Sequence, residues 1–175
     1  SYIPWRWHQV EEGTSDFDGH SHPMRNLAGF LDLAASMGLY IIARPGPYIM
    51  AETTHEGIPD WVFTHYPQVA FISQDGKPQN IVSYLHPQFL ACVHQWYQAV
   101  FQVLAPRQIT RGGKIIMAQL DNEMGMIAWV RNIIDTNPDT ISRMASYLSE
   151  AYGQRLSDYY LIDSLEKFLL DGLTD

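Results

Sequence analysis

Hydrophobic positions recur along the chain with two different spacings, and together they predict alternating helices and strands. Residues 27–37 carry apolar side chains at helical spacing before Gly38, which predicts a helix over about residues 22–37. Residues 39–43 are continuously apolar, as is typical of a parallel strand buried on both faces. The same order returns in residues 87–104, a wide amphipathic face, and residues 114–120, a second buried run. The pattern predicts an α/β fold with a parallel sheet.

Weaker signals cover the rest of the chain. Residues 1–8 are rich in strand-prone aromatics interrupted by Pro4, and we expect them to form the end of another strand. We expect residues 53–83 to form a long connection with a tight turn at residues 75–78. A loop around Trp129 is expected to precede two helices, over residues 140–152 and 157–170.

Both buried runs end on polar or stiff sequence. The second is followed directly by Asp121, Asn122 and Glu123, and the first by Arg44 and a loop with two prolines. In barrels of alternating strands and helices, active sites lie at the carboxyl ends of the strands, so we expect the chemistry there. Two structural alternatives exist: Asp121 and Asn122 cap a helix that begins near Met124, and Arg44 pairs with a neighbouring carboxylate.

Composition narrows the class of function. The 175 residues are 46% hydrophobic and 13% aromatic, which is enough for a core. A formal net charge of −8 argues against binding to nucleic acid or to an anionic membrane surface. No apolar run is long enough to span a bilayer. Cys92 is the one cysteine, and with the absence of a visible signal peptide it favours a cytoplasmic location.

Other chemistries find little support in the sequence. His20 and His22 flank Ser21, but no third ligand stands at a suitable spacing, so we interpret them as surface residues rather than metal ligands. No glycine-rich phosphate loop and no serine or cysteine nucleophile motif is present. We therefore expect neither a metal nor another cofactor.

Four separated segments carry a resemblance to a known family. They are residues 2–5 with His8 and Gly13, residues 38–48 with Ala51 and Glu52, residues 57–61, and residues 113–125. In this order they are similar to the β-galactosidases of glycoside hydrolase family 35. The resemblance covers about residues 1–125. It implies that residues 1–175 are a fragment of a catalytic (β/α)8 TIM barrel, contributing strands two to four with their helices.

The resemblance also implies an activity and a set of site residues. The activity is hydrolysis of terminal β-galactosides, in a galactoside or oligosaccharide substrate, by a retaining double-displacement mechanism. Glu123 would be the general acid/base, and Asn122 would bind the 2-hydroxyl group of the sugar. Tyr2, Ala51 and Glu52 would line the pocket that recognises the other galactose hydroxyls.

The nucleophile of such a reaction is expected outside this chain. A barrel of this type has about 250 residues, and only three strands can be counted here. The later glutamates, Glu150 and Glu166, lie in predicted helices. We therefore expect a fragment that needs the remainder of the barrel and is inactive by itself. Two alternatives stay open: another retaining glycosidase, such as the family 42 type, or a non-catalytic sugar-binding or scaffold remnant of a barrel.

Overall fold

The computed structural model describes residues 1–153, 155–156 and 167–169, which form two compact units. The first unit combines Ser1–Tyr66 with Cys92–Met124. The second combines Pro67–Ala91 with the described residues from Gly125 onward. Most of the helix expected over residues 157–170 lies outside the described residues.

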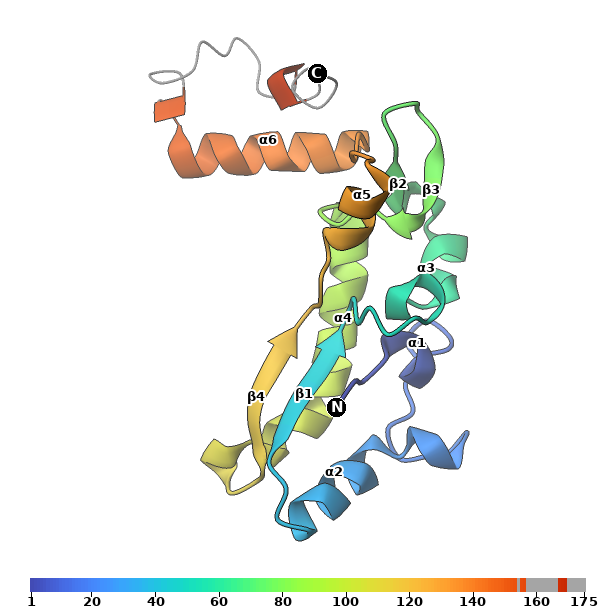
Figure 1. The fold of residues 1–175 in the computed structure, drawn as a ribbon, viewed down its shortest axis with the longest axis vertical. Coiled ribbons are helices and arrows are strands. Elements are labelled where there is room, and N and C mark those ends of the chain that lie inside the picture. Colours follow the sequence, from blue (N-terminus) through green and yellow to red (C-terminus); the bar gives the residue numbers. More distant parts are fainter. Residues whose placement is uncertain (154, 157–166, 170–175) are drawn as a thin grey trace. The chain divides into compact units, whose positions relative to one another are not determined.

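A parallel sheet is the frame of the first unit. β1 (Ile41–Gly46) pairs in parallel with β4 (Ile115–Leu120), and Tyr2 forms a further parallel bridge with Arg44 of β1. Figure 1 shows β1 and β4 side by side, with the long helix α4 (Pro87–Leu104) alongside them. The parallel α/β arrangement expected from the sequence is confirmed.

The expected burial of both strands on both faces is wrong in this chain, because Ile42, Ile116 and Met117 are exposed. β1 also starts two residues later than the expected strand and runs on through Arg44 and Pro45 to Gly46.

The first residues leave the expected strand at Pro4. Hydrogen bonds to β1 end at Ile3, and Trp5–His8 form the short helix α1 with Pro4 as its N-cap residue. The ring of Pro4 fixes φ near the helical range and removes an N–H donor that a strand ladder requires. The expectation of a strand through residue 8 is therefore wrong beyond Pro4.

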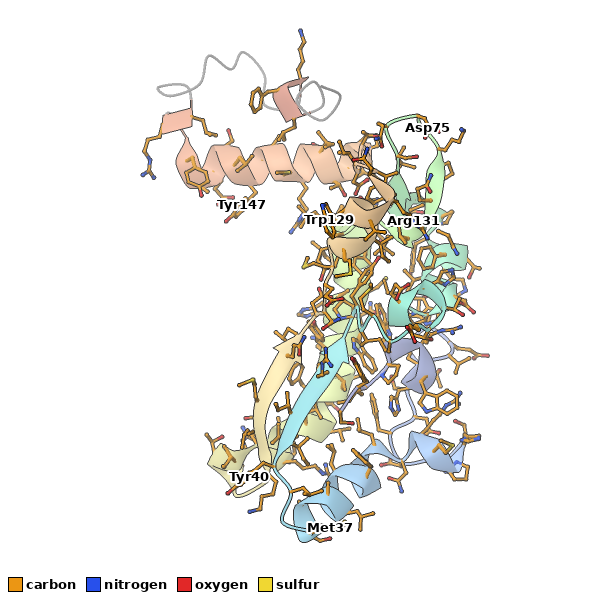
Figure 2. The ribbon with its side chains drawn as sticks, viewed as in Figure 1. Met37, Tyr40, Asp75, Trp129, Arg131 and Tyr147 are labelled. Carbon is orange, nitrogen blue, oxygen red and sulfur yellow. The ribbon has the colours of Figure 1, made fainter. Side chains whose placement is uncertain are left out.

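The helix expected over residues 22–37 is split in two. A 3₁₀ turn, Pro23–Arg25, precedes α2 (Leu27–Ser36). Asn26 separates them because its side chain accepts a hydrogen bond of 2.8 Å from the N–H of Gly29, which caps α2. At the other end, Gly38 has a φ of 80°, which ends the helix and turns the chain into β1. Met37 and Tyr40, both exposed, flank this turn (Figure 2).

Three tryptophans, which we call the indole cluster, form the centre of the first unit. Trp5 and Trp96 are stacked with ring centroids 5.9 Å apart, and Trp61 meets Trp5 edge-on at 5.7 Å. Each indole N–H has an acceptor: the Gln9 side chain for Trp5, the Gln9 carbonyl for Trp61 and the Pro45 carbonyl for Trp96. The amphipathic face predicted for residues 87–104 therefore contributes Trp96 to the core.

The start of β4 depends on a close backbone approach. Gly113 donates its N–H to the carbonyl of Gln108, and a Cβ atom at Gly113 would lie 1.9 Å from the carbonyl oxygen of Arg107. Gly112, the preceding residue, has a φ of 84° and open space around its Cα. Only glycine therefore fits at Gly113, which fixes where β4 begins.

The long connection expected over residues 53–83 contains regular elements. In the first unit it forms the 3₁₀ helix Thr54–Gly57 and α3 (Asp60–His65). In the second unit it forms the 3₁₀ helix Pro67–Val69 and an antiparallel hairpin of β2 (Ala70–Ile72) and β3 (Pro78–Val82). The turn between the two strands lies at residues 73–77, so the turn expected at 75–78 is there except for Pro78, which begins β3. Figure 2 shows Asp75 at its tip.

Two helices follow in the second unit. α6 (Pro138–Tyr152) matches the helix expected to end at Gly153, with its start two residues earlier. α5 (Met126–Arg131) occupies the region expected to be a loop, and its Trp129 side chain is 80% exposed (Figure 2). α5 has only about one and a half turns and a largely exposed surface, so its hydrophobic pattern shows little helical periodicity. No helix in the described part of the chain is long and apolar enough to cross a membrane.

Candidate active site

The carboxyl ends of the strands bring Tyr2, Arg44 and Asn122 together. Arg44 lies where the register of β1 against β4 is irregular, and such irregularities re-aim side chains. Its guanidinium Nη2 donates a hydrogen bond of 2.5 Å to Oδ1 of Asn122, just beyond the end of β4. The guanidinium carbon lies 4.2 Å from the centre of the Tyr2 ring. Two residues expected to bind substrate therefore contact the same arginine.

Asp121 ties the end of β4 to the loop after β1. Its N–H donates to the carbonyl of Gly46 (3.0 Å), and its Oδ1 accepts from the N–H groups of Tyr48 (3.1 Å) and Asn122 (3.2 Å). Burial raises the pKa of the Asp121 carboxyl above its ordinary value, while the two backbone donors act in the opposite direction. The carboxylate of Asp121 is therefore a structural link between the two strand ends.

Neither Asp121 nor Asn122 caps a helix. α5 begins at Met126, its N-cap residue is Gly125, and no side chain provides a cap hydrogen bond. The helix-cap alternative considered from the sequence is therefore wrong. Both side chains are used within the strand end instead.

The amide of Asn122 is held in one orientation. Its Oδ1 receives hydrogen bonds from Arg44 and from Nε2 of Gln119, the latter at 2.9 Å. A guanidinium has only donors, so the atom of Asn122 that faces Arg44 is the oxygen. Gln119 Nε2 also donates to the backbone carbonyl of Asp121 (3.2 Å), which fixes the orientation of the Gln119 amide independently. We call Arg44, Gln119 and Asn122 the amide lock.

Glu123 is exposed and lies in a strained backbone conformation, with a φ of 51°. Residues other than glycine are disfavoured there, at a cost of about 1–3 kcal/mol each, and such residues gather at functional sites. Six of the seven in the described part of the chain lie in the segments that follow β1 and β4. They are Met50, Glu52, His55, Glu56, Asp121 and Glu123.

Ala51 and Glu52 are exposed in the loop that follows β1. The N–H of Ile49 donates to the carbonyl of Glu56 (3.0 Å), which closes this loop around them. Within the described residues, no hydrogen bond joins Ala51 or Glu52 to Asn122. Their assignment to substrate binding therefore stays a prediction.

Two aromatic residues of α4 hold the carboxyl end of β1. Nε1–H of Trp96 donates to the carbonyl of Pro45 (2.8 Å), and the hydroxyl of Tyr97 donates to the carbonyl of Gly46 (2.6 Å). Burial raises the pKa of Tyr97 to about 12, so its hydroxyl stays protonated and remains a donor at neutral pH. The helix therefore fixes the strand end from which the loop with Ala51 departs.

Sequence reasoning did not identify two members of the amide lock as parts of the site. The sequence suggests a carboxylate partner for Arg44, but no ion pair found among the described residues includes it. Its Nε is buried without a partner there. Gln119 had a detectable signal, because it is the one polar residue in the apolar run Ile115–Leu120.

Metal-ligating side chains do not gather in the part of the chain that the structure describes. It contains no group of three or more His, Cys, Asp and Glu that could hold an ion. Of the two histidines considered from the sequence, His22 uses its Nδ1 to accept from the N–H of Met24 (3.2 Å).

Comparisons with known proteins identify the family of this chain. The model of "Glycosyl hydrolases family 35" matches residues 1–154. An exo-beta-D-glucosaminidase of Thermococcus kodakarensis is 44% identical over 128 residues, or 70% of this chain. A beta-1,2-glucosyltransferase of Ignavibacterium album is 37% identical over 155 residues, or 87% of this chain. A beta-galactosidase of Mus musculus is 32% identical over 124 residues, or 71% of this chain.

The chain spans only part of each of these relatives: 16%, 22% and 17% of their length, respectively. The family match runs through both strand ends, so it includes Arg44 and the Asn122-Glu123 pair. It confirms the resemblance seen in the four sequence segments. The chain belongs to glycosyl hydrolases family 35.

Proposed function

We propose that the protein containing this chain hydrolyses terminal β-linked glycosides by a retaining double-displacement mechanism, with Glu123 as the general acid/base. The observation that carries the proposal is the end of β4. Asn122 is held there by Arg44, while the adjacent Glu123 is exposed in a strained conformation. A carboxylic acid beside a fixed sugar-binding amide is what protonation of a glycosidic oxygen requires.

The mechanism has two steps. Glu123 first donates its proton to the leaving oxygen while a second carboxylate attacks the anomeric carbon. Its carboxylate then removes a proton from the water that releases the sugar. In this proposal the second carboxylate lies outside this chain, about 5 Å from that of Glu123. Glu150 belongs to the interior of the helix α6 and does not follow a strand, so we do not assign it this role.

The sugar-binding part of the proposal uses both strand ends. Asn122 would contact the 2-hydroxyl group, and Tyr2, Ala51 and Glu52 would contact the other hydroxyls. A site built to hydrogen-bond hydroxyl groups discriminates strongly against sugars that lack them. Support for this arrangement comes from the placement of Tyr2 and Asn122 against the same guanidinium.

Two terminal sugars are candidates. We propose a β-galactoside, as the resemblance of the strand-end segments implies. The second candidate is a β-glucosaminide, because the relative of that name from Thermococcus kodakarensis has a higher identity than the mouse beta-galactosidase, 44% against 32%. The two candidates use the same acid/base chemistry and differ in the groups that the pocket must recognise.

Replacement of Glu123 tests the reaction in the whole protein. We expect Glu123→Gln to lower kcat by about 10²–10⁴-fold for an aryl glycoside with a poor leaving group, because the departing oxygen then lacks its proton donor. An activated aryl glycoside needs no such proton, and its first step should be nearly unchanged. Steady-state and burst kinetics on both substrates measure the difference.

The matched control is Glu11→Gln, which removes the same charge from an exposed residue of the first unit. It should leave both substrates unaffected. Equal slowing of both substrates by Glu123→Gln would exclude the acid/base role of Glu123. A wild-type protein that binds sugars but cleaves no aryl β-glycoside would favour the sugar-binding or scaffold alternative.

A further inference from the structure

The loop that follows β1 carries two of the residues assigned to the sugar, and the tip of this loop has few contacts. Within the described residues, no hydrogen bond holds Ala51 or Glu52, and both are exposed. Met50 and Glu52 have φ values of 45° and 54°, a conformation that is disfavoured for residues with a side chain. Such a backbone persists only where the surrounding structure imposes it. The contacts on either side of the tip must therefore determine its conformation.

The two ends of the loop are held through the backbone. The N–H of Tyr48 donates to Asp121 (3.1 Å), and the N–H of Ile49 donates to the carbonyl of Glu56 (3.0 Å). Gly57 has a φ of 100° and packs against Ile49, where a Cβ atom would lie 2.7 Å from Cγ1 of the isoleucine. These contacts fix where the loop begins and ends, while its tip needs other partners.

Side chains of two helices hold the far side of the tip. After β1 the chain runs to α3, which lies beside α1 (Figure 1). Nη1 of Arg6, in α1, donates to the hydroxyl of Thr53 (3.4 Å). Its Nη2 donates to both carboxylate oxygens of Asp60, the first residue of α3, at 3.4 and 3.3 Å.

His55 is joined to the same carboxylate from within the loop. Its Nδ1 lies 3.0 Å from Oδ1 of Asp60, and a carboxylate only accepts hydrogen bonds, so Nδ1 carries the proton. The imidazole ring also packs against Phe63 of α3, with ring centroids 4.3 Å apart. His55 has a left-handed backbone, with φ 51° and ψ 28°, so these contacts impose the turn that follows the tip. We call Arg6, His55 and Asp60 the loop clamp.

We propose that the loop clamp positions Ala51 and Glu52 for contact with the sugar hydroxyls other than the one at C2. The proposal rests on the proposed function, which places both residues in the sugar pocket. The three clamp residues act through the loop and not on the reacting atoms. An exposed ion pair adds little to overall stability, so opening the clamp should impair substrate recognition rather than folding.

Asp60→Asn opens the clamp with little change of shape. One carboxylate oxygen becomes an NH₂ group, which faces a donor of Arg6 or of His55 whichever way the amide turns. The whole protein is assayed with the aryl β-galactoside or β-glucosaminide that wild type cleaves. We expect kcat/KM to fall by about tenfold, because a small displacement of a substrate-positioning group is costly. Tm should be nearly unchanged.

Deoxy sugars show whether the loss lies in recognition. Aryl glycosides that lack the hydroxyl at C3, C4 or C6 are compared with the parent sugar through the ratio of kcat/KM, parent over deoxy. In wild type we expect at least one ratio of about 100-fold or more, and in Asp60→Asn that ratio should fall by about tenfold. The ratio for a sugar without its C2 substituent should not change, since Asn122 follows β4 and is not part of the loop.

Two further positions make the test independent of a single substitution. Arg6→Met removes the guanidinium, and its combination with Asp60→Asn should lower the ratio no further than either change alone, because both open the same clamp. His55→Asn keeps an N–H near the place of Nδ1 and tolerates a left-handed backbone, so it should retain most of the ratio. His55→Ala has neither property and should lose it.

The matched control is Asp32→Asn. Asp32 of α2 pairs with Arg107 in the same unit, and its side chain is 61% exposed, against 62% for Asp60. The variant therefore removes the same charge from an equally exposed ion pair that does not include the loop. It should leave every ratio unchanged.

The outcomes separate the clamp from the reaction. If Asp60→Asn and Arg6→Met slow the parent and all deoxy sugars equally, or change neither, the inference is overturned while the glycosidase proposal stands. A wild-type protein that cleaves the C3, C4 and C6 deoxy sugars as fast as the parent also overturns the inference, because the loop then recognises none of these hydroxyls. Absence of hydrolysis of any aryl β-glycoside by wild type overturns the proposed function, and the inference fails with it.

Discussion

The two units are built around different kinds of interior. The first has the indole cluster of Trp5, Trp61 and Trp96, each at most 5% exposed. The second has hydrogen-bonded polar side chains between its hairpin and α6, which we call the polar network. Four of them are buried and Asp135 is half-buried; the buried ones are Ser83, His86, Asn137 and Thr140. The cluster has large apolar contact areas, and the network has directional hydrogen bonds.

Asn137 shows how closely the polar network is matched. Its amide nitrogen donates to the carbonyls of Gln68 (3.0 Å) and Ala70 (2.9 Å), at the entry to β2. Its side-chain oxygen accepts from the N–H of Asp139 (3.1 Å) and so caps α6. One side chain therefore joins the hairpin to the helix through both ends of its amide.

Asp135 performs a similar task with a carboxylate. It accepts from the N–H groups of Ile72 (3.3 Å) and Asn137 (3.1 Å) and from the hydroxyl of Ser83 (2.5 Å). The Ser83 hydroxyl also contacts that of Thr140. When one member of such a network is removed, its hydrogen-bond partners stay buried without a partner. When one ring of an apolar cluster is removed, contact area is lost and neighbouring side chains fill part of the cavity.

The largest effect should come from breaking the indole cluster. Trp96→Ala removes a fully buried ring and the donor to Pro45, and we expect a loss of about 3–5 kcal/mol in the stability of the first unit. Hydrogen exchange of amides in Ser1–Tyr66 measures this loss locally. Trp96→Phe keeps an aromatic ring and should lose less. Exchange within twofold of wild type in Trp96→Ala would contradict the central role of the cluster.

A smaller loss should follow from Asn137→Ala in the second unit. Two buried carbonyls lose their donor and α6 loses its cap, so we expect a loss of about 2–4 kcal/mol. Asn137→Asp is the informative companion, because it restores the cap oxygen but not the two donors. Exchange rates of amides in β2 and α6 should rise in both variants. If amide exchange in Asn137→Asp were close to that of wild type, the loss of stability in Asn137→Ala would come from the missing helix cap alone.

The smallest effect is the change of folding stability with pH, which should have opposite signs for one aspartate in each unit. The hydroxyl of Ser21, with backbone N–H groups, holds the pKa of Asp16 in the first unit below its ordinary value. That group therefore stabilises the fold above about pH 4 and loses this contribution as pH falls. Burial raises the pKa of Asp135 above its ordinary value, so its contribution is present at low pH and is lost as pH rises.

Two Asp→Asn variants measure these signs through Tm between pH 3 and pH 7. Asp16→Asn should lower Tm at pH 7, and the deficit should shrink toward pH 3. For Asp135→Asn, the Tm of the variant minus that of wild type should be most positive at pH 7 and should become smaller toward pH 3. If both differences change with pH in the same direction, the comparison of the two units is wrong on this point.

Long elements with a strong period could be predicted from the sequence, and short ones could not. The helix expected over residues 87–104 has those bounds as α4, and the strand expected over residues 114–120 begins one residue later as β4. α3, α5 and the β2–β3 hairpin were missed, because a helix of six residues shows fewer than two turns of its period. Their formation depends on contacts such as those of Asn137, which lie far apart in sequence.

The same limit applies to the candidate site. The meeting of Tyr2 and Asn122 near one edge follows from parallel strands that end on polar residues. The amide lock does not follow, because Arg44 and Asn122 are separated by 78 positions and meet only through a local slip of register. Which atom of an amide faces a ligand is a property of side-chain packing, and no spacing in the sequence encodes it.

The two glycines before β4 should differ in how well they tolerate substitution. At Gly112 the surrounding space is open, so residues that tolerate a left-handed backbone, such as asparagine, can enter with modest strain. At Gly113 the nearest atom is a backbone oxygen that cannot move aside, so even alanine would displace the first residue of β4. We expect a substitution at Gly113 to disturb the site as well, because Asn122 and Glu123 follow directly after the other end of β4. Of the two adjacent glycines, the first can therefore be replaced at modest cost and the second cannot.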